Sequence, residues 1–224
     1  MSVELYHHQV DALLKLSNGK ILCGGTGSGK SVVSIAYYWY RVSGGSLRPF
    51  KAPKSFVPLY IITTARKRDS LEWEGDLAKF GLSKHIQSIT IDSWNNIKNY
   101  VGASGAFFIF DEQRLVGNGT WVKSFLKIAK LNQWILLSAT PGDNWMDYVP
   151  VFIANGFYKN RSEFVHEHVV YSPFVRYQKV DRYIGESRLK RLRAKVLVDM
   201  PYSRKTVRHR HSIPALYDEG LYDT

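Results

Sequence analysis

An eight-residue segment near the start of the chain, GGTGSGKS at 24–31, restricts the fold more than any other feature. Its Gly24, Gly29, Lys30 and Ser31 fit the pattern G-x-x-x-x-G-K-[ST], which is typical of loops that bind phosphate groups. The apolar segment KILCG leads into the loop, and SVVSIAYYW, which suits a helix, follows. Such a loop needs a strand before it, glycines that let backbone N–H groups point inward, and a helix whose positive end faces the anion. The segment therefore predicts a strand, a phosphate-binding loop and a helix, in that order.

The residues of this loop have separate expected roles. Lys30 would reach the β- and γ-phosphates of a nucleotide, Ser31 would offer its hydroxyl to Mg²⁺, and backbone amides around Ser28 would line the cradle. The residues expected to bind nucleotide are Gly25, Thr26, Gly27, Ser28, Gly29, Lys30 and Ser31. A dinucleotide-binding turn fits less well, because G-x-G-x-x-G begun at Gly25 requires glycine where Lys30 stands.

Short apolar segments alternate with helix-like segments along most of the chain. Strands are predicted at 20–24, 58–63, 85–91, 106–110 and 133–138. Helices are predicted at 30–42, 68–80, 93–99 and 121–131, a surface loop at 43–57, and a basic helix at 188–198 followed by a strand-like segment. This alternation predicts an α/β fold with a doubly wound, mostly parallel sheet and helices on both faces. The aromatic segment 37–40 is expected mainly to pack in the core.

A second chemical feature is the segment AFFIFDEQR at 106–114. Its apolar residues predict a buried strand, and Asp111 and Glu112 follow at the carboxyl end, where open α/β sheets bind their ligands. Asp111 would hold Mg²⁺ through its water shell, and Glu112 would orient and deprotonate an attacking water. An acidic pair that only caps the next turn is the alternative.

The chain is basic, with a formal net charge of +12. The segment 176–210 holds 12 basic and 3 acidic residues, which favours a polyanionic partner, nucleic acid above all, or else forms a solvated basic face. No apolar stretch is long enough to span a membrane, the start lacks the pattern of a secretion signal, and Cys23 is the only cysteine. These features predict a protein of the cytoplasm.

Six segments in order resemble superfamily 2 helicases. They are LYHHQVDAL (an aromatic and glutamine element), GGTGSGKS (motif I), IITTARKRDSLEW (motif Ia), TIDSW (motif Ib), DEQR (the DExx box) and LLSATPGDNWMDY (motif III). TIDSW, the Asn-Trp pair after SATP, and the late segment LRAKVLVDMPYSRKTVRHR are most similar to the Swi/Snf-type branch, and within it to phage-encoded helicase-like ATPases. Gln113 and Arg114 depart from the usual box.

The resemblance implies a RecA-like P-loop domain that binds ATP and Mg²⁺ and moves on DNA, in the host cytoplasm if it is phage-encoded. It implies that Gln9 recognises adenine, with Tyr6 or His7 as a stacking surface. It implies that Lys30, Asp111 and Glu112 are catalytic and that Ser31 and Asp111 hold the metal. It further assigns DNA contacts to Thr63, Thr64, Arg66, Ser93 and Trp94, and coupling of hydrolysis to movement to Ser138 and Thr140.

The resemblance also implies a division of the chain. Residues 1–160 would form the first RecA-like lobe, and 161–224 a basic extension toward a second RecA-like lobe that carries an arginine finger. We expect the chain without that lobe to bind Mg·ATP weakly and to hydrolyse it slowly. A nucleotide-responsive nucleic-acid clamp and a P-loop NTPase of another class stay open as alternatives.

Overall fold

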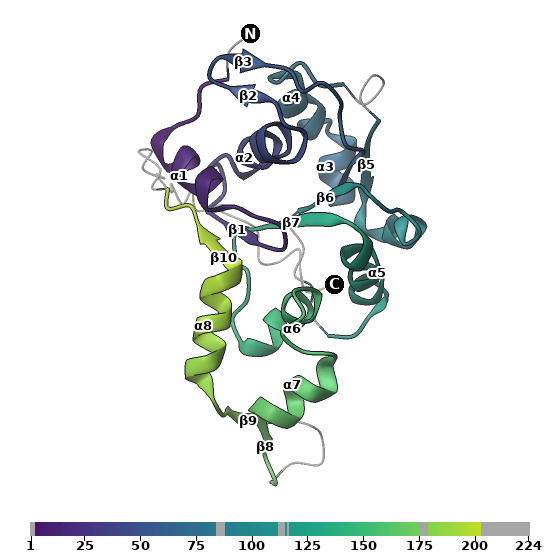
Figure 1. Ribbon diagram of the computed structural model, residues 1–224. Helices are drawn as coiled ribbons and strands as arrows, with labels where there is room; N and C mark the ends of the chain where they lie inside the picture. Colours follow the sequence, from purple (N-terminus) through teal and green to yellow (C-terminus); the bar gives the residue numbers. More distant parts are fainter. Residues whose placement is uncertain (1–2, 84–87, 112–114, 116, 175–178, 203–224) are drawn as a thin grey trace, which may run out of the picture.

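A six-stranded parallel sheet forms the centre of the molecule (Figure 1). The structure, a computed structural model, describes residues 3–83, 88–111, 115, 117–174 and 179–202. The strands follow the order β10-β1-β7-β6-β4-β5, and every neighbouring pair is parallel. Their bounds are β1 (Ile21–Cys23), β4 (Leu59–Thr63), β5 (Ile89–Ser93), β6 (Phe107–Asp111), β7 (Gln133–Ser138) and β10 (Leu197–Asp199). The predicted parallel α/β sheet is confirmed.

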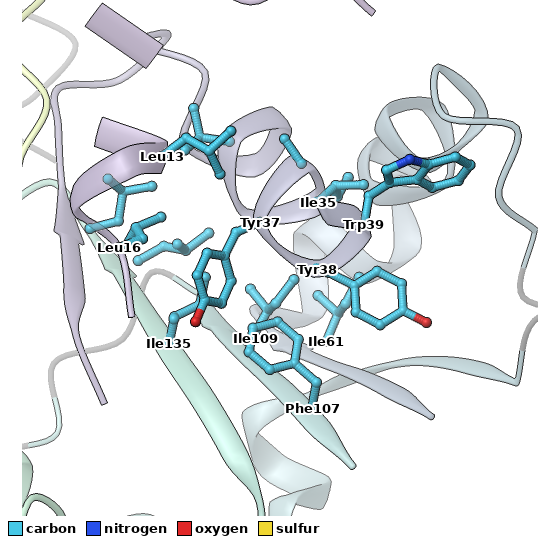
Figure 2. Close-up of a cluster of buried hydrophobic side chains, with 14 of the residues drawn as sticks. Leu13, Leu16, Ile35, Tyr37, Tyr38, Trp39, Ile61, Phe107, Ile109 and Ile135 are labelled. Carbon is cyan, nitrogen blue, oxygen red and sulfur yellow. The ribbon is translucent and has the colours of Figure 1, made fainter. Parts of the chain in front are cut away.

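Three helices cover one face of the sheet: α1 (His7–Lys15), α2 (Lys30–Tyr37) and α4 (Glu72–Ala78). Alternate strand residues point to opposite faces, so Phe107 and Ile109 of β6 point toward these helices. Figure 2 shows Phe107 and Ile109 beside Ile135 and under Leu13 of α1 and Ile35 of α2. Each side chain of this size contributes about 1.5–3 kcal/mol when fully buried. This layer holds α1 and α2 above the sheet, next to the glycine-rich loop between β1 and α2.

The other face is covered by η2 (Trp94–Tyr100), α5 (Thr120–Leu131) and α6 (Trp145–Ala154). Phe108 and Phe110 of β6 point this way and stack on each other with centroids 5.6 Å apart. Phe125 of α5 packs edge-on against Trp134 of β7 at 4.9 Å. Helices on both faces confirm the doubly wound arrangement.

Several predicted helices differ in detail. The helix predicted at 30–42 is α-helical through Tyr37 and then continues as a π-helix, η1 (Tyr38–Val42). The helix predicted at 68–80 is two helices, α3 (Ala65–Asp69) and α4, because Leu71 between them has a positive φ of 56°. The segment predicted at 93–99 forms a 3₁₀ helix, and the loop at 43–57 contains a hairpin of β2 (Ser46–Leu47) and β3 (Phe50–Lys51).

The aromatic segment after the phosphate-binding loop packs in the core with one exception. Tyr37, Tyr38 and Trp39 are buried, and the Tyr38 hydroxyl donates to the Val57 carbonyl at 2.6 Å. Tyr40 is 39% exposed. The wider π-helical turn changes the direction of successive side chains, and Tyr40 is thereby placed at the surface.

The chain beyond residue 160 leaves the sheet and then returns to it. Helix α7 (Arg161–His168), strands β8 (Val169–Tyr171) and β9 (Val180–Tyr183), and helix α8 (Glu186–Val196) extend away from the sheet as an arm (Figure 1). The helix predicted to reach residue 198 ends at Val196, because Leu197–Asp199 pair as β10 with the open edge of β1. The central sheet thus includes residues from both sides of the expected boundary at 160.

Within the described ranges, no helix is long and apolar enough to cross a membrane.

Candidate functional site

Five strands deliver polar or reactive residues to one edge of the sheet. Cys23, Thr63, Ser93, Asp111 and Ser138 are the last residues of β1, β4, β5, β6 and β7, and parallel strands share their carboxyl edge. Cys23 pairs in register with Ser138, and Thr63 with Ser93. Neighbouring strands lie about 4.8 Å apart, so the ends of β1 and β6, with β7 between them, lie about 10 Å apart. This edge is the candidate site.

The loop between β1 and α2 has the backbone that its glycines predict. Gly27 and Gly29 have positive φ of 80° and 86°, and α2 begins directly after Gly29. Gly25, Thr26 and Gly27 are exposed, whereas Ser28 is buried. The first backbone N–H groups of α2 have no partner within the helix and point out of its N-terminal end. The loop therefore offers an anion site at the end of a strand.

The lysine of the motif is held at this loop. Lys30 Nζ donates to the Gly24 carbonyl at 2.6 Å and the Gly25 carbonyl at 3.1 Å. Ser31, next along α2, is half-buried. Burial first, and Asp199 second, raise the pKa of the Cys23 thiol, while Lys30 acts against them. Cys23 is therefore a weakly acidic thiol beneath the loop, a poor nucleophile at neutral pH.

Gln9 ties helix α1 to the loop. Its Oε1 accepts from the Tyr6 amide at 3.0 Å, and its Nε2 donates to the Ser28 carbonyl at 3.2 Å. A Cβ on Gly29 would lie 2.2 Å from that Nε2, so the contact requires glycine. Gln9 is 6% exposed, and these bonds occupy both ends of its amide. Recognition of adenine by Gln9 stays a prediction.

Aromatic rings lie beside the same loop. The exposed Tyr6 stacks on His8 with ring centroids 5.9 Å apart. The ring centroid of Tyr202 lies 5.3 Å from that of His8. His7, the other expected stacking residue, instead pairs with Asp11 at the surface. His8 and Tyr202 were not expected from the sequence; Tyr202 reaches this position because β10, just before it, pairs with β1.

Asp111 is the most constrained group at this edge. It is 1% exposed, and its Oδ2 accepts from Thr63 Oγ1 at 2.9 Å, from Lys67 Nζ at 3.1 Å and from Trp73 Nε1 at 3.3 Å. The Trp94 indole donates to the Asp111 backbone carbonyl at 2.9 Å. A buried carboxylate needs such donors, since transfer from water without them is costly. Glu112, Gln113 and Arg114 lie outside the described residues.

Three of the five residues expected to contact nucleic acid are directed inward. Thr63, Ser93 and Trp94 are 0%, 3% and 2% exposed, and Thr63 and Trp94 bond to Asp111. Thr63 and Trp94 thus support the Asp111 carboxylate, and the Ser93 amide donates to Asp92 at 2.7 Å. Contact of these three residues with DNA stays a prediction, made from the sequence for side chains that are buried here. Thr64 caps α3 by accepting from the Lys67 amide at 3.3 Å, and Arg66 is exposed.

Lys67 and Trp73 were missed in the sequence. Both lie within the motif Ia segment, but their contact with Asp111 spans 44 and 38 residues of chain. The contact follows from β4 and β6 being neighbours in the sheet, with Ile62 in register with Phe110. These two residues can be identified from the order of the strands in the sheet, but not from any local sequence pattern.

Ser138 connects the phosphate-binding loop to the segment after β7. Its carbonyl accepts from the Gly24 amide at 3.1 Å, and its hydroxyl accepts from the Thr140 amide at 3.1 Å. Ser138 is buried between β1 and β6, while Thr140 is exposed. Ser138 thus bonds both to the loop and to the exposed Thr140, and the coupling role of Ser138 and Thr140 stays a prediction.

The residues at this edge fit a nucleotide triphosphate with a divalent cation. A glycine-lined loop, a helix N-terminus, Lys30 and the Ser31 hydroxyl suit phosphate, and Asp111 offers a carboxylate at the same edge. Among the described residues no three His, Cys, Asp or Glu side chains gather into a metal cluster. A cation here would take its other oxygen ligands from phosphate and water, as Mg²⁺ does.

Comparison with solved structures identifies the fold. A Sulfolobus solfataricus SWI2/SNF2 ATPase core in complex with dsDNA has a TM-score of 0.65 at 15% identity, over 90% of this chain and 45% of that chain. A Sulfolobus solfataricus SWI2/SNF2 ATPase core domain has a TM-score of 0.62 at 15% identity, over 100% of this chain and 46% of that chain. The Pyrococcus furiosus Hef helicase domain has a TM-score of 0.50 at 14% identity, over 74% of this chain and 40% of that chain.

These similarities show a RecA-like α/β fold of the kind found in SWI2/SNF2 ATPase cores. This chain spans less than half the length of each of the three structures. No protein-family model matches the sequence, and no curated protein matches it.

Proposed function

We propose that this chain is the ATP-binding lobe of an ATP-dependent DNA translocase or helicase of superfamily 2, of the Swi/Snf type. One observation carries the proposal: the glycine-rich loop after β1 and the buried Asp111 of β6 lie at one edge of a RecA-like sheet, with β7 between the two strands and its Ser138 bonded to Gly24 of the loop. The fold of SWI2/SNF2 ATPase cores supports it. The similarity to phage-encoded members is part of the proposal and rests on the sequence motifs.

The loop and Asp111 divide the work of binding Mg·ATP. Backbone amides from Gly25 to Gly29 and the Lys30 ammonium would hold the phosphates, and Ser31 and Asp111 would hold the cation. Mg²⁺ would neutralise charge on the phosphates. Glu112, next after Asp111, is proposed to orient and deprotonate the attacking water.

DNA is the proposed polyanionic partner. Of the surface residues in motif Ia, Arg66 is exposed on α3, and Thr64 fixes the start of that helix. One SWI2/SNF2 neighbour binds double-stranded DNA, and this chain carries a net charge of +12. Phosphate contacts of this kind position a strand without reading its sequence.

A second RecA-like lobe of the same protein is the other proposed partner, and cleavage of ATP would require it. The similar ATPase cores are about twice as long as this chain. An arginine finger from such a lobe accelerates hydrolysis roughly 10³- to 10⁵-fold. Residues 1–224 should therefore hydrolyse ATP slowly, and robust DNA-stimulated turnover by them would contradict this part of the proposal.

Binding of duplex DNA tests the functional class. We expect a fluorescent duplex to bind residues 1–224 with an affinity that falls steeply with salt, and Arg66→Ala to weaken it and reduce the salt slope by about 1. Lys79→Ala, at an exposed lysine that follows α4, is the matched control and should change little. No binding to duplex or single-stranded DNA would favour a P-loop NTPase of another class. A nucleotide-responsive clamp would also bind DNA, but because it does not move along DNA, the intact protein would not displace another protein bound to the same duplex.

A further inference from the structure

Lys67 places a positive charge against the carboxylate that is proposed to hold the metal. Its Nζ lies 3.1 Å from Asp111 Oδ2, and the two side chains are 19% and 1% exposed. Thr63 and Trp73 donate to the same oxygen but carry no charge. Among these three donors to Oδ2, Lys67 alone compensates the charge of the buried carboxylate.

The helix that carries Lys67 also forms the proposed DNA-facing surface. Helix α3 has three consecutive basic residues, which point in different directions. Arg66 is exposed, Arg68 reaches Asp92 at 3.3 Å and Asp69 at 2.8 Å, and Lys67 turns in toward Asp111. Lys67 thus lies between a surface suited to phosphates and the carboxylate of the nucleotide site.

Two cations compete for one carboxylate. A divalent cation bound by Asp111 would repel an ammonium held at the same oxygen, so the contact between Lys67 and Asp111 opposes metal binding. The side chain of lysine is long and flexible, and an ammonium that leaves Asp111 finds an equivalent partner in a phosphate on α3. A polyanion on α3 would draw Lys67 outward and so favour the cation at Asp111.

We propose that Lys67 couples the two sites by exchanging its ammonium between Asp111 and a nucleic-acid phosphate. Without nucleic acid it acts as the counter-ion of Asp111 and weakens Mg²⁺ binding. With nucleic acid bound it releases Asp111 to the cation. Linkage requires the reverse effect as well, so Mg·ATP should tighten nucleic-acid binding by the same factor. This inference rests on the proposed function and assigns a positioning role to Lys67.

The test measures binding by the full chain and does not depend on turnover. The Mg²⁺ concentration that half-saturates binding of a fluorescent ATP analogue is measured with and without a short duplex. For the wild type, duplex should lower this concentration about fivefold or more, within the usual range for coupled sites. Lys67→Met, which removes the charge but keeps the length, should lower it without duplex and abolish the response. Lys67→Arg should retain the response, and Lys79→Met, the charge control, should behave as wild type.

The outcomes are distinct. Equal half-saturating Mg²⁺ with and without duplex in the wild type overturns the role of Lys67 while leaving the nucleotide site intact. A duplex response that persists in Lys67→Met also overturns it. Absence of Mg-dependent binding of the analogue by the wild type overturns the proposed function itself. Thermal unfolding of each variant shows whether it is folded. If Lys67→Met does not fold, the wild-type measurements with and without duplex still show whether the two sites are coupled.

Discussion

At the scale of single residues, the buried Asp111 carboxylate and its hydrogen-bond donors are the central feature of the candidate site. A carboxylate that is 1% exposed needs hydrogen-bond donors to be stable, and Thr63, Lys67 and Trp73 donate to it. These donors come from three different elements that adjoin β6, so the position of the acid depends on the whole strand edge. Substitution of a donor should therefore affect stability even where no ligand is bound.

The Trp73 indole provides one such test. Trp73→Phe keeps most of the packing but removes the N–H that donates to Asp111 at 3.3 Å. Trp134→Phe is the matched control, because Trp134 is also 1% exposed and packs against Phe125 on the other face of the sheet. We expect Trp73→Phe to lower the free energy of unfolding by about 1–2 kcal/mol more than Trp134→Phe, as measured with urea. Equal losses would show that the bond to Asp111 does not contribute.

Gly29 provides a second test, of the loop itself. Gly29→Ala would place a Cβ 2.2 Å from Gln9 Nε2 at a φ of 86°, and it should cost about 1–3 kcal/mol of stability. At Gly25 a Cβ would meet nothing within 4 Å, so Gly25→Ala should change stability by less than about 0.5 kcal/mol. Thermal unfolding without nucleotide measures both. A neutral Gly29→Ala would mean that α1 is not held against the loop by Gln9.

At the scale of elements, Asp92 joins α3, β5 and η2. It accepts from Arg68 of α3 and from Asn96 and Tyr100 of η2. Burial by itself would raise the pKa of Asp92, but hydrogen bonds from Tyr100, Asn96, the Ser93 amide and Arg68 outweigh it and lower the pKa below its ordinary value. The ionised carboxylate thus stabilises the fold and fixes α3 beside the candidate site.

This network predicts a pH dependence. Because the pKa of Asp92 is lower in the folded chain, its contribution is complete above the pKa of the unfolded chain and is lost as pH falls through the folded value. The difference in unfolding free energy between wild type and Asp92→Asn should be largest at neutral pH and shrink in acid. Urea unfolding at several pH values between about 3 and 7 measures it, and other acidic groups cancel in the difference. A difference that does not change with pH would contradict this role.

Local patterns predict most of the elements and some of the site. Each of the five predicted segments contains a strand or part of one, because apolar residues suit a sheet buried on both faces. The strand predicted at 85–91 is observed at Ile89–Ser93, and residues 85–87 lie outside the described part of the chain. Strand β10 was missed, since Leu197–Asp199 continue a basic helical segment and become a strand only beside β1. The strand, the loop with its glycines at positive φ, and the helix that follows were predictable from spacing alone, and phosphate binding stays a prediction. Lys67 and Trp73 were not predictable, because register between β4 and β6 brings them to Asp111.

At the scale of the whole molecule, β10 connects the arm to the sheet. Its pairing with β1 places Met200 next to the phosphate-binding loop, where the Met200 amide donates to the Cys23 carbonyl at 2.7 Å. Strand β10, which follows the arm, and β1, which leads into the glycine-rich loop, are therefore neighbours in one sheet.

Substitution in β10 tests this integration. Val198 is 3% exposed in the core, so Val198→Asp should lower the free energy of unfolding by several kcal/mol. Ala194→Asp, on the exposed face of α8, should cost about 1 kcal/mol or less. Chemical denaturation measures both. Similar small losses would mean that residues 197–199 are not part of the sheet in solution.

Binding of Mg·ATP by residues 1–224, measured by isothermal titration calorimetry, tests the central proposal most directly. We expect weak, saturable binding that requires Mg²⁺ and is abolished in Lys30→Ala, because the Lys30 ammonium lies over the phosphate-binding loop. Thermal unfolding of the same variant controls for loss of fold. Equal affinity of wild type and folded Lys30→Ala, or no Mg-dependent binding by the wild type, would contradict an ATP site at residues 24–31.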